Sequence, residues 1–379
     1  MKLLHLFSNW RWTGPAEPAV VLAAAIHDAG WDVIFACGKA AKGRDNGVFR
    51  NARERGVPTR VGLRLQKHIN PVFDIQDGRR LRQWLFNDRF DIIHTHLRNA
   101  HVVAALATRR MTNKPLIVRT CYEGDGPTGH REAWLLRRHT DGLIVVSDLA
   151  RQKVVEKTGF PADSVWAVHT PIDMDRFNPD RGLGDQKAQL GIDPNAFVVG
   201  IIARIQWHRR YRIFLEAIDR ARHELPNLRA IIVGRGTNMK PIALDPIKKM
   251  KLDKVVLVPG YQTGDDFVRT IATMDVNVYL VPGTDGSCRA VRETMAMGVP
   301  VIAARRGILH ELVGDGGRGL VIEDTPENLA NAIVALAKDR ERRRVFGQHA
   351  RQFAIENFSF DRQAHIVGGI YRELAGRGK

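Results

Sequence analysis

The chain has 379 residues, of which 44% are hydrophobic and 26% are charged. This length is comfortable for two domains with separate cores, and the composition excludes a disordered chain or a bundle of membrane helices. The formal net charge of +17 favours an acidic partner, such as nucleic acid, anionic lipid or the phosphates of a nucleotide sugar.

The N-terminal residues and the cysteines indicate a compartment. The opening MKLLHLF predicts a short strand and no signal peptide, because polar residues follow it at once. No apolar run is long enough to span a bilayer. The cysteines, Cys37, Cys121 and Cys288, are scattered, so they support neither a disulfide framework nor a zinc finger. We therefore expect a cytoplasmic protein.

The first half of the chain alternates strands with helices. Residues 2–7 predict a strand, after which a loop with Gly14 leads to a helix over about 19–30 and to a second strand, WDVIFAC. This order is typical of a doubly wound sheet, in which such a loop faces the ligand. Gly14 would let the backbone approach that ligand closely. Glu17 is a candidate for a ligand contact or for favouring the helix dipole.

The strand DIIHTH ends in two histidines. His94 and His96 have the spacing of metal ligands, but no third ligand at a suitable spacing is evident, so we predict no metal. His101, in the next helix, is a candidate for the ligand space or for packing. Arg119 and Tyr122 end the strand PLIVRTCY. The basic stretch HREAWLLRRH is either an ordinary packed helix or a segment that lies on an anionic membrane.

The second half begins after the polar segment RGLGDQKAQLGIDPN, which indicates a domain boundary. Arg204 directly follows an apolar strand, and Arg209 comes five residues later. A further strand runs into Gly234, and another ends at Gly260 and Tyr261. By themselves, these glycines are weak evidence for a ligand-binding loop. No Walker motif is present, which argues against an NTPase.

The stretch from Leu280 to Ala304 predicts a strand, a loop, a helix and a strand, the unit that builds a parallel sheet. Asp285 comes just before the helix, whose first turn offers free N–H groups to an anion. Glu293 lies about two helical turns later and returns to nearly the same side. Two carboxylates thus flank a helix end that attracts phosphate. The alternative is a surface helix capped by Asp285, with Glu293 in solvent.

The block DGSCRAVRETMAMGVPVIA resembles the E-x7-E region of the retaining glycosyltransferases of family 4. The resemblance extends from the N-terminal glycine loop through the turn PIDMDRFNP to the tail FSFDRQAHIVGGIYREL. It implies the GT-B fold, an α/β architecture of two Rossmann-like, doubly wound parallel-sheet domains that face a central cleft. We predict an acceptor-side domain over 1–178, a nucleotide-sugar-binding domain over 179–359, and a C-terminal helix over 360–379 that crosses back onto the first.

The resemblance also implies roles for single residues. Glu293 would hold the nucleotide ribose, and Asp285, where the family usually has Glu, would hold hydroxyls of the donor sugar. Arg204 and Arg209 would bind the donor diphosphate, with Arg209 in the place of a lysine. Tyr122 stands where many members have a histidine, so the role of that histidine does not transfer. The other donor contacts implied are Gly14, Gly234, Gly260, Tyr261, Gly286, Ser287, Cys288 and Arg289. Acceptor or sugar contacts are expected from Glu17, His101, Arg119 and Tyr122.

The implied function is retaining transfer of a sugar from a UDP- or GDP-linked donor to a glycan or glycolipid, in the synthesis of cell-envelope polysaccharide or lipopolysaccharide. Arg204, Arg209 and helix N-termini would stabilise the leaving diphosphate without a metal or other cofactor. We expect an anionic membrane surface as a further partner, and no nucleic acid. Two alternatives are another GT-B activity, such as a nucleotide-sugar epimerase or a phosphorylase, and a non-catalytic protein that binds nucleic acid or an anionic surface.

Overall fold

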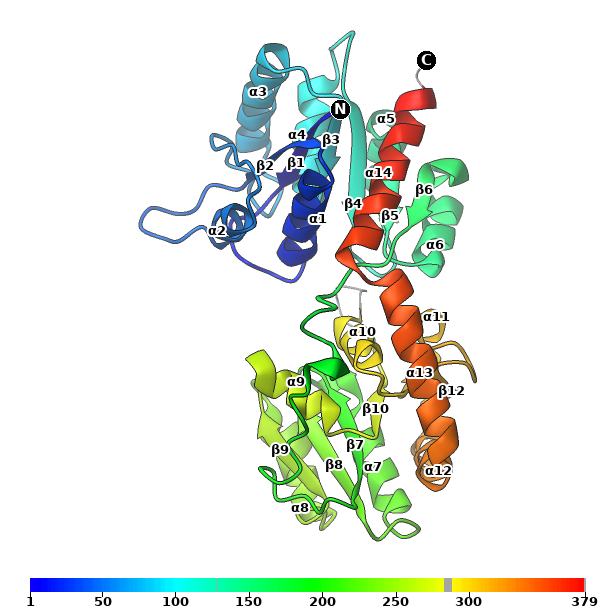
Figure 1. Cartoon of the computed structure of the whole chain (residues 1–379). Coiled ribbons are helices and arrows are strands. Elements are labelled where there is room, and N and C mark those ends of the chain that lie inside the picture. The colour runs from blue at the N-terminus through cyan, green and yellow to red at the C-terminus, as the bar shows by residue number, and fades with distance from the viewer. Residues whose placement is uncertain (128, 283–287, 378–379) are drawn as a thin grey trace. The chain divides into compact units, whose positions relative to one another are not determined.

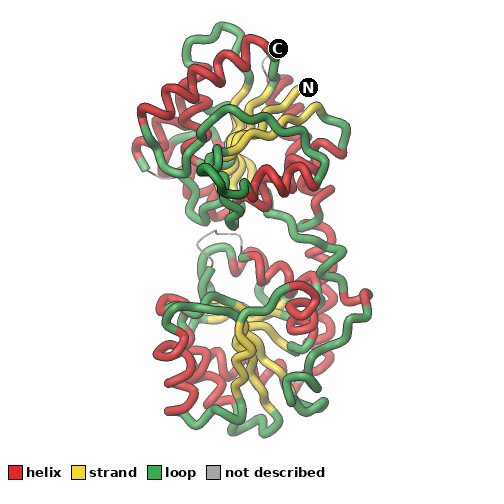
Figure 2. Tube along the Cα trace, turned by 90° about the vertical axis from the view of Figure 1, so that its left-hand side faces the viewer, coloured by secondary structure: helices red, strands yellow, loops and turns green. Residues whose placement is uncertain are grey.

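The computed structural model describes residues 1–127, 129–282 and 288–377, which form two compact units. Unit 1 contains Met1–Pro171 and Phe360–Lys379, and unit 2 contains Ile172–Gly283 and Cys288–Ser359. In each unit, helices cover both faces of a parallel sheet (Figures 1 and 2). The doubly wound α/β architecture predicted from the sequence is therefore confirmed.

The described part of unit 1 has six parallel strands in the order β2–β1–β3–β4–β5–β6. They are β1 (Lys2–Phe7), β2 (Asp32–Cys37), β3 (Ile92–Thr95), β4 (Leu116–Cys121), β5 (Gly142–Val145) and β6 (Val165–Ala167). The strand order reverses at β1 and β3. Ligands of such sheets bind beyond the carboxyl ends of the strands at the reversal.

Helices of unit 1 are held by alternating strand side chains. Leu3 and Phe7 of β1 face the helices α1 (Ala16–Asp28), α2 (Gly47–Glu54) and α14 (Phe360–Arg377). Leu4 and Leu6 face α3 (Pro71–Asn87) and α4 (Arg98–Thr108). The helices α5 (His130–His139) and α6 (Asp148–Thr158) cover β5. The helix α14 joins unit 1 because its apolar residues recur at helical spacing on one side and pack beside α1 (Figure 1).

The described part of unit 2 also has six parallel strands, in the order β12–β11–β10–β7–β8–β9. They are β7 (Phe197–Ile202), β8 (Leu228–Val233), β9 (Val256–Gly260), β10 (Val276–Tyr279), β11 (Val301–Ala304) and β12 (Gly319–Ile322). Here the order reverses at β7 and β10, so these two strand ends are the expected ligand position.

Helices of unit 2 lie in two groups. One sheet face packs against α7 (Tyr211–Ala221), α8 (Asp245–Lys249) and α12 (Pro326–Lys338). The other packs against α9 (Gly264–Ala272), α10 (Arg289–Ala296), α11 (Leu309–Val313) and α13 (Arg340–Asn357). Ile172 and Phe177 are buried in this second core, and the N–H of Ile172 donates to the carbonyl of Phe358 at 2.9 Å. The chain therefore enters unit 2 at Ile172.

The helices within the described ranges were searched for a transmembrane span. None of them is both long enough and apolar enough to pass through a lipid bilayer.

Gly347 marks a close approach of α13 to the turn before β11. A β-carbon at Gly347 would lie 2.1 Å from the carbonyl oxygen of Gly298. We expect Gly347→Ala to lower the free energy of unfolding by about 1–3 kcal/mol, because backbone would have to move. In α14, a β-carbon at Gly369 meets no atom within 4 Å, so Gly369→Ala should raise stability by up to about 1 kcal/mol. Urea unfolding measures both variants, and equal effects would contradict this packing.

Candidate active site

Charged residues of unit 2 gather beyond the carboxyl ends of β7 and β10, where the strand order reverses. Arg204 follows β7 closely, and Arg209 ends the 3₁₀ turn Trp207–Arg209 in the same loop. The loop after β10 leads to α10, which carries Arg289 and Glu293. Adjacent parallel strands end at one edge of a sheet, so these residues share the position at which such folds bind phosphate-bearing ligands.

Arg204 is exposed and has no hydrogen bond or ion pair with any residue that the structure describes. The loop beneath it is rigidly held. The N–H groups of Ala203 and Ile205 donate to carbonyls of β8 and its loop, at 3.1 Å each. β-Carbons at Gly234 and Gly236 would lie 2.0 Å from the carbonyl oxygens of Ala203 and Ile205. The two glycines thus let these loops pack backbone to backbone, which positions Arg204.

Arg209 is 8% exposed and holds the chain beyond β10. Its Nη1 donates to the carbonyl oxygens of Val281 and Pro282, at 3.0 Å each. Its Nε is buried without a partner in the described ranges. This arginine therefore fixes the start of the loop that leads to α10. The predicted site residues that lie in that loop, outside the described residues, are Asp285, Gly286 and Ser287.

Glu293 is a buried carboxylate that is paired with an arginine one helical turn away. It lies in α10, and Nε of Arg289 donates to its Oε1 at 2.6 Å. A carboxylate this deeply buried needs such a partner. Cys288, which precedes the helix, is fully buried in a left-handed conformation with φ 46°. The predicted helix with Glu293 is thus present, and Cys288 serves as core.

The end of β9 presents an aromatic ring to solvent. Gly260 has φ +85°, a conformation that favours glycine. Tyr261 is mostly exposed, and the guanidinium of Arg235 lies 4.4 Å from its ring centroid. Together they form a flat surface of the kind on which a base can stack.

The predicted loop after β1 carries Gly14, which is exposed, and leads into α1. Glu17 is half-buried in the first turn of α1, where a carboxylate favours the helix dipole.

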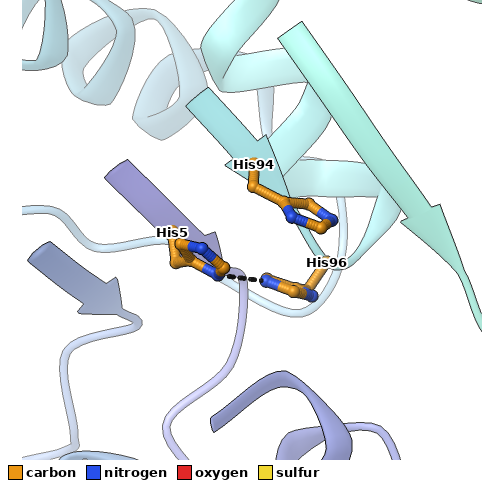
Figure 3. A group of neighbouring side chains, drawn as sticks. All are labelled: His5, His94 and His96. Atoms are coloured by element: carbon orange, nitrogen blue, oxygen red, sulfur yellow. Dashed lines mark hydrogen bonds between the residues drawn. The ribbon is translucent and has the colours of Figure 1, made fainter. Parts of the chain in front are cut away.

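Three histidines fill the interior of unit 1 where β1 and β3 end (Figure 3). The parallel register pairs His5 with His94, and His96 follows β3, so β1 supplies a third ring to the H-x-H pair. All three are fully buried, and their ring centroids are separated by 4.4 to 5.1 Å. His5 Nδ1 lies 3.0 Å from His96 Nε2, a hydrogen bond that one tautomer of each ring satisfies.

Two tyrosines continue this cluster. His96 Nδ1 is 2.9 Å from the hydroxyl of Tyr122. His94 Nε2 is 2.7 Å from Thr120 Oγ1, and its Nδ1 bonds the hydroxyl of Tyr371 from α14. Tyr122 is buried, so its hydroxyl is used inside the domain. The bond to Tyr371 connects the C-terminal helix to the centre of the sheet.

The ring geometry tests whether the three histidines could hold a metal ion. Burial lowers the pKa of His5 to about 3 and that of His94 and His96 well below the ordinary value, so the rings are neutral, as metal binding requires. However, His94 and His96 are stacked with an interplanar angle of 18°. Their in-plane lone pairs run side by side and do not converge. Both nitrogens of His94 also have other partners. The arrangement fits a hydrogen-bonded core and not a metal centre.

A second buried polar network surrounds Arg119 on β4. Its Nη1 donates to Glu132 Oε2 at 2.6 Å and lies 3.3 Å from His101 Nδ1. The other carboxylate oxygen of Glu132 pairs with Arg98. His101 Nε2 bonds Thr140 at 2.8 Å. Burial, and then the charge of Arg119, lower the pKa of His101 well below its usual value. Arg119 and His101 thus lie in the interior of unit 1.

Three residues that make buried or paired polar contacts in the structure are absent from the residues predicted from the sequence. His5 stands inside an apolar strand, and Tyr371 lies on a helix 277 positions from its partner His94. Asp324, just after β12, accepts two hydrogen bonds from Arg306, at 2.9 and 3.1 Å, and pairs with Arg210. Only a histidine within an apolar strand could have been noticed beforehand.

Two family descriptions match the chain. Residues 17–176 match "Glycosyltransferase Family 4", and residues 184–353 match "Glycosyl transferases group 1". The chain is a family 4 glycosyltransferase. This membership confirms the predicted family and enzyme class, a retaining glycosyltransferase that uses a nucleotide-sugar donor.

Relatives of this family 4 glycosyltransferase include two curated enzymes. The D-inositol 3-phosphate glycosyltransferase of Saccharomonospora viridis is 29% identical in an alignment 304 residues long, which covers 76% of this chain and 67% of that protein. The UDP-Gal:alpha-D-GlcNAc-diphosphoundecaprenol alpha-1,3-galactosyltransferase of Escherichia coli is 22% identical in an alignment 332 residues long, which covers 84% of this chain and 83% of the relative.

Solved structures share the fold. Anabaena Alr3699/HepE, crystallised with UDP, has a TM-score of 0.80 at 19% identity, covering 98% of this chain and all of that one. The same protein was also crystallised with UDP-glucose. The fold of the family 4 glycosyltransferase is GT-B, as predicted.

Proposed function

We propose that this glycosyltransferase moves a hexose from a UDP-linked donor to a glycan or glycolipid acceptor of the cell envelope, at the inner face of the membrane. The observation that supports the proposal is the strand reversal of unit 2, since Arg204 and Arg209 follow β7 and Glu293 lies in the helix that follows β10. The Anabaena structure supports UDP, since UDP is its ligand. The name of the E. coli relative includes both a UDP-sugar and a lipid-linked acceptor, which supports the acceptor class.

Charge development at the leaving group gives these arginines their role. As the glycosidic C–O bond breaks, the UDP diphosphate gains negative charge, which preorganised cations stabilise more strongly than they stabilise the ground state. Arg204 is exposed and uncommitted among the described residues, so its guanidinium can grip phosphate in a bidentate fashion. Arg209 contributes positive charge and holds Val281 and Pro282, which precede Asp285 in the chain.

Glu293 and Asp285 would orient the rest of the donor. Arg289 bonds Oε1 of Glu293, so a ribose hydroxyl would donate to the other oxygen. Asp285 would accept from sugar hydroxyls, and the N-terminus of α10 would face the phosphates. Gly260 and Tyr261 would border the base.

The acceptor side would be formed by unit 1. Of the residues predicted to contact the acceptor, Glu17 is the one whose side chain still reaches solvent, in the first turn of α1. We therefore assign the acceptor contact to Glu17. His101, Arg119 and Tyr122 are buried and hydrogen-bonded. We assign them the task of holding the strand ends that carry the acceptor loops.

Donor identity can be tested by thermal unfolding with UDP-, GDP- and ADP-sugars. A ligand at 100 times its Kd stabilises the folded state by about 2.7 kcal/mol, so a UDP-hexose should raise the midpoint by several degrees while the others do not. Glu293→Gln should remove most of that rise. A rise with only GDP- or ADP-sugars would overturn the UDP assignment. Labelled donor incubated without acceptor provides a second readout, because release of an altered sugar nucleotide would indicate an epimerase.

A further inference from the structure

The helix α3 of unit 1 has an outward face that the proposed reaction leaves unexplained. We propose that this face, together with the preceding segment 61–70, is the surface by which the enzyme docks on an anionic lipid bilayer. The inference rests on the proposed function in one respect only, that the acceptor lies at a membrane.

The inward face of α3 packs against the rest of unit 1. Leu81 and Leu85 pack in the core shared with α4, and a β-carbon at Gly78 would lie 3.0 Å from Leu106 Cβ, which shows how closely the two helices approach. Both carboxylates of the helix also lie on this side. Asp77 accepts from the backbone of the segment 61–70, and Asp74 accepts from Asn70 and Asn99. The acidic groups of α3 are thus buried and committed.

The outward face of α3 is apolar and basic. Val72 is 62% exposed, Ile75 46% and Phe86 70%. At about 100° per residue, these side chains and exposed Arg79 fall within an arc of about 60°. Ile69, just before the helix, is 45% exposed. Ile69, Val72 and Ile75 thus lie together at the start of the helix, and Phe86 lies about 16 Å further along the same side, beyond Arg79. Large apolar side chains exposed among basic ones in this way mark an interaction site.

Charge identifies the partner. The exposed charged residues of the segment 61–87 are all basic, namely Arg64, Lys67, Arg79 and Arg80, and this described segment exposes no carboxylate. Each basic group near an anionic lipid surface strengthens binding by about fivefold. The apolar side chains would enter the boundary between headgroups and acyl chains, and the arginines would remain at the phosphates.

A second copy of the chain is a less suitable occupant. It would place the same four basic side chains opposite each other, in a protein of net charge +17, and like charges at an interface oppose association. The helix α5, which we considered from its sequence as a membrane segment, is also less suitable. Trp134 is its one large exposed apolar residue among those described, and Arg137 is engaged with the carbonyl of Thr158.

Vesicle co-sedimentation of the full chain tests the proposal. The protein should bind vesicles of phosphatidylcholine with about 30% phosphatidylglycerol, and bind phosphatidylcholine alone at least tenfold more weakly. The triple variant Val72→Ser, Ile75→Ser, Phe86→Ser should lose about tenfold or more of the binding to the mixed vesicles, as should Arg79→Glu with Arg80→Glu. Trp134 and Ile355 are exposed apolar residues away from α3. The control variants Trp134→Ser and Ile355→Ser should therefore bind vesicles like the wild type.

Unchanged vesicle binding in the triple variant would overturn the proposal. So would a wild-type dimer that the same substitutions dissociate, because a second copy would then be the occupant. The substituted residues lie outside the donor site, so UDP-sugar should still raise the thermal midpoint of each variant. If α3 variants lose vesicle binding in a protein that no sugar nucleotide stabilises, the docking surface stands and the proposed function fails.

Discussion

Replacing Arg204 with alanine is expected to lower kcat/KM for sugar transfer by about 10²–10³-fold, the usual effect of removing one preorganised group that stabilises developing negative charge. The folded state should hardly change. Arg204 is exposed and unbonded within the described part of the chain, and a substitution of such a side chain usually changes stability by less than about 0.5 kcal/mol. Arg209 is a poorer test, because its removal also frees the carbonyls of Val281 and Pro282.

The measurement compares initial rates of transfer from labelled UDP-sugar with thermal midpoints of the same preparations. Arg340→Ala is the matched control, since Arg340 is also an exposed arginine of unit 2 but begins α13. The control should retain full activity. Full activity in Arg204→Ala would remove the proposed diphosphate contact. A large fall in its thermal midpoint would instead show a structural role.

Acidification from pH 7 to pH 5 is expected to destabilise unit 1 by about 2 kcal/mol or more. Burial lowers the pKa of His5 to about 3, and the pKa values of His94, His96 and His101 lie well below normal. In the unfolded chain each histidine titrates near 6.5. Below that pH the histidines of the unfolded state bind protons, whereas those of the folded state stay neutral. The free energy of unfolding is therefore highest above pH 6.5 and falls as the pH drops toward the folded pKa. His5 alone contributes about 2 kcal/mol over this range, and the other three histidines act in the same direction.

Urea unfolding followed by tryptophan fluorescence measures this loss, since six of the seven tryptophans belong to unit 1. His68→Gln is the control, because His68 is exposed in a loop, and it should leave the pH dependence unchanged. His5→Asn should reduce the dependence by roughly one proton, or about 1.4 kcal/mol per pH unit. The same free energy of unfolding at pH 7 and pH 5 would contradict the neutral, buried state of the cluster.

The local parts of the fold could be predicted because they depend on nearby residues. The chain alternates apolar strands, which are buried on both faces, with helices that have one apolar side, and glycine turns join them. This alternation predicts parallel, doubly wound sheets. The placement of Arg204 directly after β7 and of Glu293 within α10 followed in the same way, since each requires only a strand or a helix at the right position.

Side-chain direction at the strand ends could not be predicted. Tyr122 is predicted to contact the acceptor or the sugar, and in the structure its hydroxyl bonds buried His96. Gly234 packs against the backbone that carries Arg204, which the sequence did not indicate, and its nucleotide contact stays a prediction. These outcomes depend on which loop packs under which, and that depends on residues distant in the chain.

The sequence by itself determined the family, the two doubly wound sheets and the cationic and acidic residues after β7 and in α10. The tertiary structure alone decided that His5 joins His94 and His96, that Tyr371 closes their network, and that the acids of α3 turn inward while its exposed apolar residues face out. The physical reason is that periodicity along a chain reports which side of one element is apolar. Strand order, register and helix docking decide which of those sides meet, and they are set by contacts between residues tens to hundreds of positions apart.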